Sequence, residues 1–252
     1  MADMHTIAGV DLEIETRGTG RPMLVLHGGE GLGADRPWLD LLARTHRVIA
    51  PHHPGFGRST LPDWIGTTDD LAYLYLDLAG KLDLRDATLV GASFGGWIAA
   101  EMMVRSTARF SRLVLAAPLG IKVRGHLDRD IADMHAMTRD EFLAKAFADP
   151  ANGRLDTSKL SDMEIAAVVR GREALTLFGW KPYMHNPRLK RWLHRIDKPT
   201  LVLHGDKDRI ISADYARAYA AGIPGARFEA IAGCGHFPLW EKPEAVARLI
   251  AA

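Results

Sequence analysis

The chain has 252 residues, of which 47% are hydrophobic and 25% charged, and its formal net charge is +1 at pH 7. This composition is that of an ordinary folded domain, and the weak charge argues against a nucleic-acid partner. No apolar run approaches about 18 residues, so we expect no membrane span and no signal peptide. Cys234 is the single cysteine, which excludes an intramolecular disulfide, and we expect a cytoplasmic protein.

Short apolar runs alternate with segments of helical length along the first part of the chain. Apolar and polar residues alternate at 10–14, which predicts the second arm of an antiparallel hairpin. Four uniformly apolar runs follow and are typical of strands covered on both faces; they lie at residues 23–26, 48–50, 88–90 and 113–116. A helix is expected near 71–82, after capping candidates at 67–70. The repeated strand and helix pattern predicts an α/β fold with a mostly parallel sheet.

Residues 119–195 interrupt this pattern because they contain no comparable apolar run. Thr138 with Glu141, and Ser161 with Glu164, have the spacing of capping boxes that begin helices. We therefore predict a helical cap at 119–195, inserted into a core made of 1–118 and 196–252. Two strand and helix pairs close the core; their strands are expected at 200–203 and 227–231 and their helices near 215–221 and 243–250.

The sequence G-A-S-F-G at residues 91–95 follows one predicted strand and precedes a predicted helix. A serine hydroxyl becomes a nucleophile when a sharp turn presents it to a base, and the two flanking glycines relieve crowding in such a turn. Ser93 is therefore the candidate nucleophile. At the start of a helix the amide of Phe94 is free to donate a hydrogen bond to an oxyanion. The alternative is a glycine-rich turn with a capping serine.

Candidate partners for Ser93 lie after the last predicted strands, where loops reach the same edge of the sheet. His236, in a Gly-His-Phe sequence, is the candidate general base by its position among the 11 histidines. Asp206 and Asp208 both follow the strand at 200–203, and either supplies the acid that orients a histidine. The chain order Ser, Asp, His is that of hydrolases built on a parallel sheet.

A second glycine-rich turn, H-G-G-E-G at residues 27–31, follows the strand at 23–26. Its position suits the second amide of an oxyanion hole, which we assign to Gly29. A phosphate-binding loop is the rival interpretation, but neither of the usual glycine-rich phosphate signatures is present.

Large apolar residues near the expected cleft are candidates for the substrate pocket, although such residues are more often core. They are Trp97, Met134, Met137, Phe178, Trp180, Tyr183 and Phe237. Arg170 or Arg172 could bind a substrate carboxylate, with a solvated helix face as the stronger alternative. His126, Asp130, Asp133 and His135 are better explained by a polar helix face than by a metal site. We expect no metal and no cofactor.

Five motifs together resemble the α/β-hydrolase superfamily: HGG, HPGFGRS, GASFGG, GDKDRI and GCGHFPLWEKPE. The resemblance covers the chain outside the cap and implies an eight-stranded sheet with one antiparallel strand, a helical cap and no cofactor. In that superfamily the acid stands three residues after the glycine that ends its strand. Counted from Gly205 this is Asp208, which leaves Asp206 a structural role.

Departures from family patterns narrow the expected reaction. His52 stands where an aspartate is usual, which leaves any contact of that carboxylate in question. Dehalogenases and epoxide hydrolases of this fold use aspartate as nucleophile, so Ser93 argues against both. Carbon–carbon bond hydrolases of meta-cleavage pathways usually carry asparagine before the serine and tryptophan after the histidine, where this chain has Ala92 and Phe237.

We therefore expect a carboxylesterase that acts on a small ester through an acyl-serine intermediate. The alternative is a meta-cleavage product hydrolase, and a further alternative is a receptor-like binding protein on the same fold. The partner is expected to be a small-molecule acyl substrate. The sequence is compatible with a homodimer. It does not assign a role to Cys234.

Overall fold

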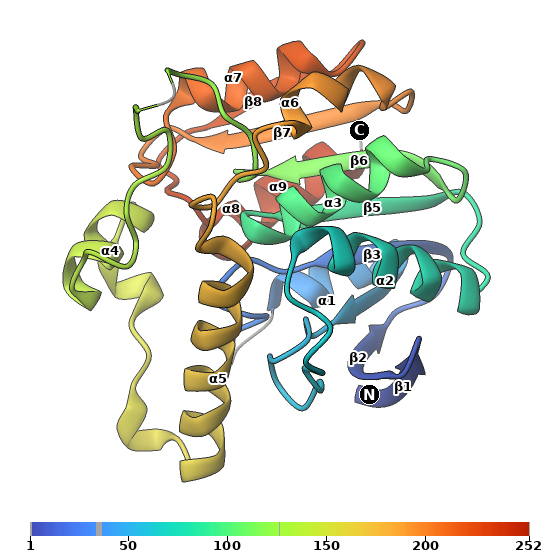
Figure 1. The fold of residues 1–252 in the computed structure, drawn as a ribbon, viewed down its shortest axis with the longest axis horizontal. Coiled ribbons are helices and arrows are strands. Elements are labelled where there is room, and N and C mark those ends of the chain that lie inside the picture. Colours follow the sequence, from blue (N-terminus) through green and yellow to red (C-terminus); the bar gives the residue numbers. More distant parts are fainter. Residues whose placement is uncertain (1, 34–36, 126, 252) are drawn as a thin grey trace.

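The computed structural model describes residues 2–33, 37–125 and 127–251. An eight-stranded sheet in the order β1-β2-β4-β3-β5-β6-β7-β8 forms its centre (Figure 1). Only β2 runs against both of its neighbours, and the other pairs are parallel. The strands are β1 (Ala2–Ile7), β2 (Val10–Arg17), β3 (Arg21–Leu26), β4 (His46–Pro51), β5 (Ala87–Ala92), β6 (Phe110–Ala116), β7 (Thr200–Gly205) and β8 (Arg227–Ile231). The predicted fold class, a mostly parallel sheet with one reversed strand, is confirmed.

Helices cover both faces of this sheet. They are α1 (Pro37–Ala43), α2 (Thr68–Lys81), α3 (Phe94–Arg105), α4 (Arg139–Ala146), α5 (Asp162–Gly179), α6 (Leu189–Trp192), α7 (Ala213–Gly222), α8 (Pro238–Glu241) and α9 (Pro243–Ala251). Short 3-10 turns are η1 (Pro150–Gly153), η2 (Thr157–Lys159) and η3 (Leu193–Arg195). Each of the described helices is either too short or too polar to cross a membrane.

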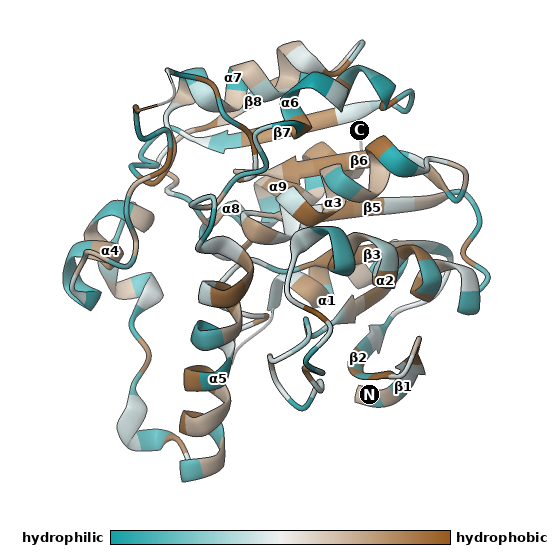
Figure 2. Ribbon diagram, in the orientation of Figure 1, coloured by the Kyte–Doolittle hydropathy of each residue, from teal (hydrophilic) through white to brown (hydrophobic). Residues whose placement is uncertain are grey.

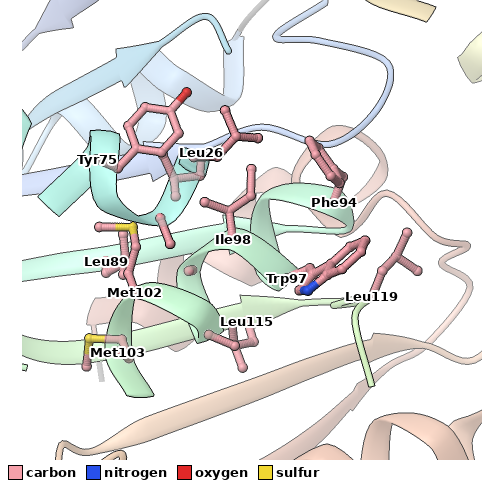
Figure 3. Close-up of a cluster of buried hydrophobic side chains, with 14 of the residues drawn as sticks. Leu26, Tyr75, Leu89, Phe94, Trp97, Ile98, Met102, Met103, Leu115 and Leu119 are labelled. Atoms are coloured by element: carbon pink, nitrogen blue, oxygen red, sulfur yellow. The ribbon is translucent and has the colours of Figure 1, made fainter. Parts of the chain in front are cut away.

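The central strands are apolar on both faces because each face is buried under helices. Along β3, Leu24 and Leu26 join the core beneath α2, α3 and α7, whereas Met23 and Val25 join the core beneath α1 and α9. Figure 2 shows β5 and β6 as apolar strands, and Figure 3 shows side chains of α3 packed against the sheet. This double burial explains why the four runs lack the alternation of a half-exposed strand.

The connection from β6 to β7 carries α4 and α5, which stand beside the sheet (Figure 1). Both begin at the predicted capping boxes, Thr138 with Glu141 and Ser161 with Glu164. Most of the stretch before α4 is irregular rather than helical. There the carboxylate of Asp130 accepts hydrogen bonds from the backbone amides of Val123 and Arg124, which holds a loop in place of a helix.

Candidate active site

Ser93 stands at the junction of β5 and α3, at the tip of a sharp turn. Its backbone angles are φ 51° and ψ −115°, a region that non-glycine residues rarely occupy. Its amide donates to the carbonyl of Ala116, and its own carbonyl accepts from Gly96 and Leu119. These contacts hold the strained turn and keep the side chain of Ser93 at the carboxyl end of the sheet.

The two glycines of the motif are required by close backbone approach. A Cβ atom on Gly95 would lie 2.2 Å from the carbonyl oxygen of Leu26 and 2.4 Å from that of His27. A Cβ atom on Gly91 would lie 2.5 Å from the carbonyl oxygen of Gly95. Helix α3 thus lies directly against β3 and β5, an approach that only glycine permits.

A continuous hydrogen-bonded chain joins Ser93, His236 and Asp208. The Nε2 atom of His236 is 2.8 Å from the Oγ atom of Ser93, and its Nδ1 atom is 2.8 Å from the Oδ2 atom of Asp208. Since a carboxylate only accepts hydrogen bonds, Nδ1 carries the proton and Nε2 offers a lone pair to the Ser93 hydroxyl. Ser93 is 143 positions from His236 in the sequence, and Asp208 is 28 positions from it. The three predicted residues nevertheless meet in the arrangement expected of a nucleophile, a base and an orienting acid.

Asp208, rather than Asp206, faces the histidine. Its side chain is completely buried, and its other oxygen accepts from the amides of Ile210 and Ile211 at 2.8 and 3.1 Å. Asp206 instead accepts from the amides of Gly233 and Cys234, which ties together the loops after β7 and β8. Burial raises the pKa of Cys234 to about 12, so this thiol stays protonated and structural at neutral pH.

The predicted oxyanion amides lie beside Ser93. Gly29 and Phe94 line the same cavity as Ser93 and His236, and neither amide donates to any residue that the structure describes. A Cβ atom on Gly28 would lie 3.1 Å from the Cβ atom of Ser93, so the glycine loop after β3 passes directly over Ser93. Two free amides next to a serine form the donor set that a developing oxyanion requires.

The cavity over Ser93 has a volume of about 200 Å3. Of the predicted wall residues, it contains Met134, Met137 and Phe237. Sequence reasoning missed Phe142 of α4 and Leu175 of α5, both of which line it. The spacing in the sequence is consistent with their position, because Arg139 with Phe142, and Arg172 with Leu175, are three residues apart and so share a helix face. The sequence does not indicate which face of each helix lines the cavity.

Four other predicted wall residues do not line the cavity over Ser93. Trp97 and Phe178 are buried in the core, where Trp97 donates to Glu101 and Phe178 stacks on the ring of Phe94. Trp180 is 61% exposed. The hydroxyl of Tyr183 accepts from the amide of Met134 and donates to the carbonyl of Ala132, which fixes the chain behind the wall.

Arg172 of α5 lines the cavity, and its guanidinium has no ion pair or hydrogen bond with any described residue. Arg170 instead donates to the carbonyl of Gly57. A guanidinium without a partner among the described residues therefore borders the cavity.

The residues considered for a metal do not converge. Asp130 pairs with Lys122 and Arg124, and Asp133 pairs with Arg129, whereas His126 lies outside the described residues. In the described part of the chain, no three His, Cys, Asp or Glu side chains gather as metal ligands would.

His52, which replaces a usual aspartate, faces two carboxylates. Its Nε2 atom is 3.5 Å from Glu15 and 4.0 Å from Glu13. Its carbonyl accepts from the hydroxyl of Ser59, which holds the loop after β4. His52 lines none of the cavity over Ser93, so we assign it no direct part in chemistry.

The model of the "alpha/beta hydrolase family" matches residues 23–249. This chain belongs to the α/β-hydrolase family. A 2-hydroxymuconate semialdehyde hydrolase of Pseudomonas sp. strain CF600 is 30% identical over 258 residues, with 96% of this chain and 88% of the relative covered.

Solved structures agree with this fold. A serine hydrolase involved in carbazole degradation (CarC) superposes with a TM-score of 0.79 over 100% of this chain and 97% of the other, at 22% identity. An esterase from Exiguobacterium antarcticum superposes with a TM-score of 0.73 over 100% and 98%, at 20% identity. These likenesses show the fold alone, and one fold carries different reactions in different proteins.

Proposed function

We propose that this α/β-hydrolase is a serine hydrolase in which Ser93 attacks a carbonyl carbon. The observation that supports this is the hydrogen-bonded chain from Ser93 through His236 to the buried Asp208. His236 takes the hydroxyl proton as the Oγ–C bond forms, and Asp208 remains ionised and stabilises the imidazolium. The amides of Gly29 and Phe94 donate to the tetrahedral oxyanion.

We further propose that the bond broken is a carbon–carbon bond in a small conjugated diketone that carries a carboxylate. Two observations support this choice over the ester: the unpaired Arg172 in the cavity, which suits an anionic substrate, and the names of relatives such as 2-hydroxymuconate semialdehyde hydrolase. Cleavage leaves the electron pair on a carbon that is stabilised as a conjugated enolate, which the His236 imidazolium protonates. Water that His236 activates then releases the acid from the acyl-serine.

Replacement of Ser93 by alanine tests the nucleophile. We expect S93A to lose nearly all hydrolysis, because removing the nucleophile of such a triad costs about six decades in kcat. The measurement is steady-state kinetics on 2-hydroxy-6-oxo-2,4-heptadienoate, whose keto form is a conjugated diketone with a carboxylate, and on a series of neutral p-nitrophenyl esters. Labelling by a fluorophosphonate is a second measurement, in which the phosphorus bonds to Oγ of Ser93 as fluoride leaves. Wild-type turnover or wild-type labelling in S93A would refute the serine mechanism.

Replacement of Arg172 by glutamine tests the acidic substrate. We expect R172Q to raise KM about tenfold or more for a substrate with a carboxylate and to leave neutral esters unchanged, since a charge-assisted hydrogen bond contributes about 1.5–3 kcal/mol. R170Q is the control, because Arg170 donates to the carbonyl of Gly57 and does not line the cavity. Equal effects of R172Q on the acidic diketone and on a neutral ester would argue against this part of the proposal.

Ester hydrolysis is the second candidate, favoured by two residues beside the triad. Ala92 precedes Ser93 and Phe237 follows His236, where carbon–carbon bond hydrolases usually carry asparagine and tryptophan. Faster turnover of neutral esters than of the acidic diketone in the same panel would select it. Labelling of Ser93 without turnover of either class would instead favour a binding protein.

A further inference from the structure

Helix α4 touches the oxyanion loop at its first residue. The guanidinium of Arg139 is 2.8 Å from the carboxylate of Glu30, and both side chains are largely covered, at 35% and 19% exposure. Glu30 is the neighbour of Gly29 in sequence, and Arg139 and Glu30 line the cavity together with Ser93. An ion pair that is partly removed from water thus joins the cap to the loop that carries one oxyanion amide.

The other end of α4 touches the histidine loop. The carbonyl of Ala146, its last residue, accepts a hydrogen bond of 2.6 Å from the backbone amide of His236. The carboxylate of Glu241 strengthens this junction, since one oxygen accepts from the amide of Gly235 and the other from that of Ala148. A Cβ atom on Gly235 would lie 2.3 Å from the Ala146 carbonyl oxygen, so the two backbones are in direct contact.

Between these contacts α4 is a short, well-capped helix. Its eight residues correspond to a length of about 12 Å at 1.5 Å per residue. The capping box of Thr138 and Glu141 satisfies amides at its start, and Phe142 and Leu143 are buried. A capped and packed helix keeps a fixed length, so a shift at one end is transmitted to the other.

We propose that α4 is a positioning strut of the catalytic site, which sets the oxyanion loop and His236 at a fixed separation. This inference rests on the serine mechanism proposed above. Arg139 is the positioning residue, and it has a second effect through charge. Without Arg139, the carboxylate of Glu30 would stand unpaired beside Gly29 and would oppose the negative charge of the oxyanion.

The test compares four variants by the rate at which a fluorophosphonate labels Ser93, which does not require the natural substrate. We expect R139Q to slow labelling about tenfold, because small misplacements of catalytic groups are costly. R139K keeps the charge and should recover most of the rate. E30Q/R139Q removes both charges and should be faster than R139Q. R154Q, which loses the exposed pair with Asp140 on the same helix, is the matched control and should label like wild type.

An R139Q rate equal to that of R154Q overturns the strut. An E30Q/R139Q rate no higher than that of R139Q overturns the second part of the proposal, the charge effect of an unpaired Glu30. Thermal unfolding of each variant shows whether a slowly labelled protein is folded. If R139Q does not fold, E30Q/R139Q, which lacks the same ion pair, is compared with R154Q in its place. Failure of the serine mechanism has a different signature, because S93A would then still be labelled.

Discussion

The residues that meet at the candidate site were predictable one by one where a local motif or the chain order points to them. Ser93 lies in a five-residue pattern whose glycines are explained by the close approach of α3 to β3 and β5. The positions of His236 and Asp208 were predicted from the chain order Ser, Asp, His and because the strands before them end at the same edge of the sheet. The choice of Asp208 over Asp206 required family spacing, because both carboxylates lie on the same short loop.

Substitution of Gly95 by alanine tests the close approach of α3 to the sheet. The new Cβ atom would lie within 2.4 Å of two backbone oxygens, which cannot move as a flexible side chain can. We expect G95A to lower the free energy of unfolding by about 3 kcal/mol, as overpacking does in a rigid core. Urea denaturation measures the loss. G66A is the control, since nothing lies within 4 Å of a Cβ atom there. Equal stability of the two variants would contradict the close approach.

The residues that line the cavity over Ser93 were predicted less well, for a reason that two side chains of α5 make clear. Phe178 and Leu175 lie on the same helix, yet the first is core and the second lines the cavity. Both are large and apolar, so residue type alone does not separate them. Residues three positions apart share a helix face, so their roles depend on what each turn of α5 meets: Phe178 stacks on Phe94, and Leu175 lies against Gly29. Those contacts are a tertiary property.

At the scale of elements, local signals were sufficient for strands and capped helices and insufficient for the rest of the cap. The capping boxes at Thr138 and Ser161 marked where α4 and α5 begin. The irregular stretch after β6 is held by the local contacts of Asp130 and also by distant partners. The hydroxyls of Tyr215 and Tyr219 on α7 bond to the backbone of Ile121 and Leu119, about a hundred residues earlier in the chain. No pattern within the stretch itself encodes such contacts.

At the scale of the whole molecule, folding buries His53 in its neutral form between the sheet and α2. The Nε2 atom of His53 donates to the carbonyl of His27, and Nδ1 accepts from the hydroxyl of Tyr75. Burial lowers the pKa of His53 from 6.5 to about 3. Below pH 6.5 the unfolded chain therefore binds a proton that the native protein does not, so the stability that this group contributes is lost as pH falls.

This difference predicts an acid-dependent stability. For His53 alone, the free energy of unfolding should fall by about 1.4 kcal/mol per pH unit below pH 6.5, or about 2 kcal/mol between pH 7.5 and 5. Urea denaturation at both pH values should show that decrease in the wild type and a decrease about 2 kcal/mol smaller in H53Q. H194Q, at an exposed histidine, should retain the wild-type decrease. The same decrease in H53Q as in the wild type would disprove the assignment.

The two ends of the cap meet at one point of the fold. Gly120 accepts a hydrogen bond from the amide of Asn186 and donates one to the carbonyl of Met184, so the chain leaves the core and returns to it side by side. Beyond this point α6 and η3 pack on α3 and α7, with Leu189 and Leu193 in the core. We propose residues 121–184 as the cap proper. A segment with adjoining ends can be exchanged as a unit by recombination, so substrate range could evolve while the triad loops keep their sequences.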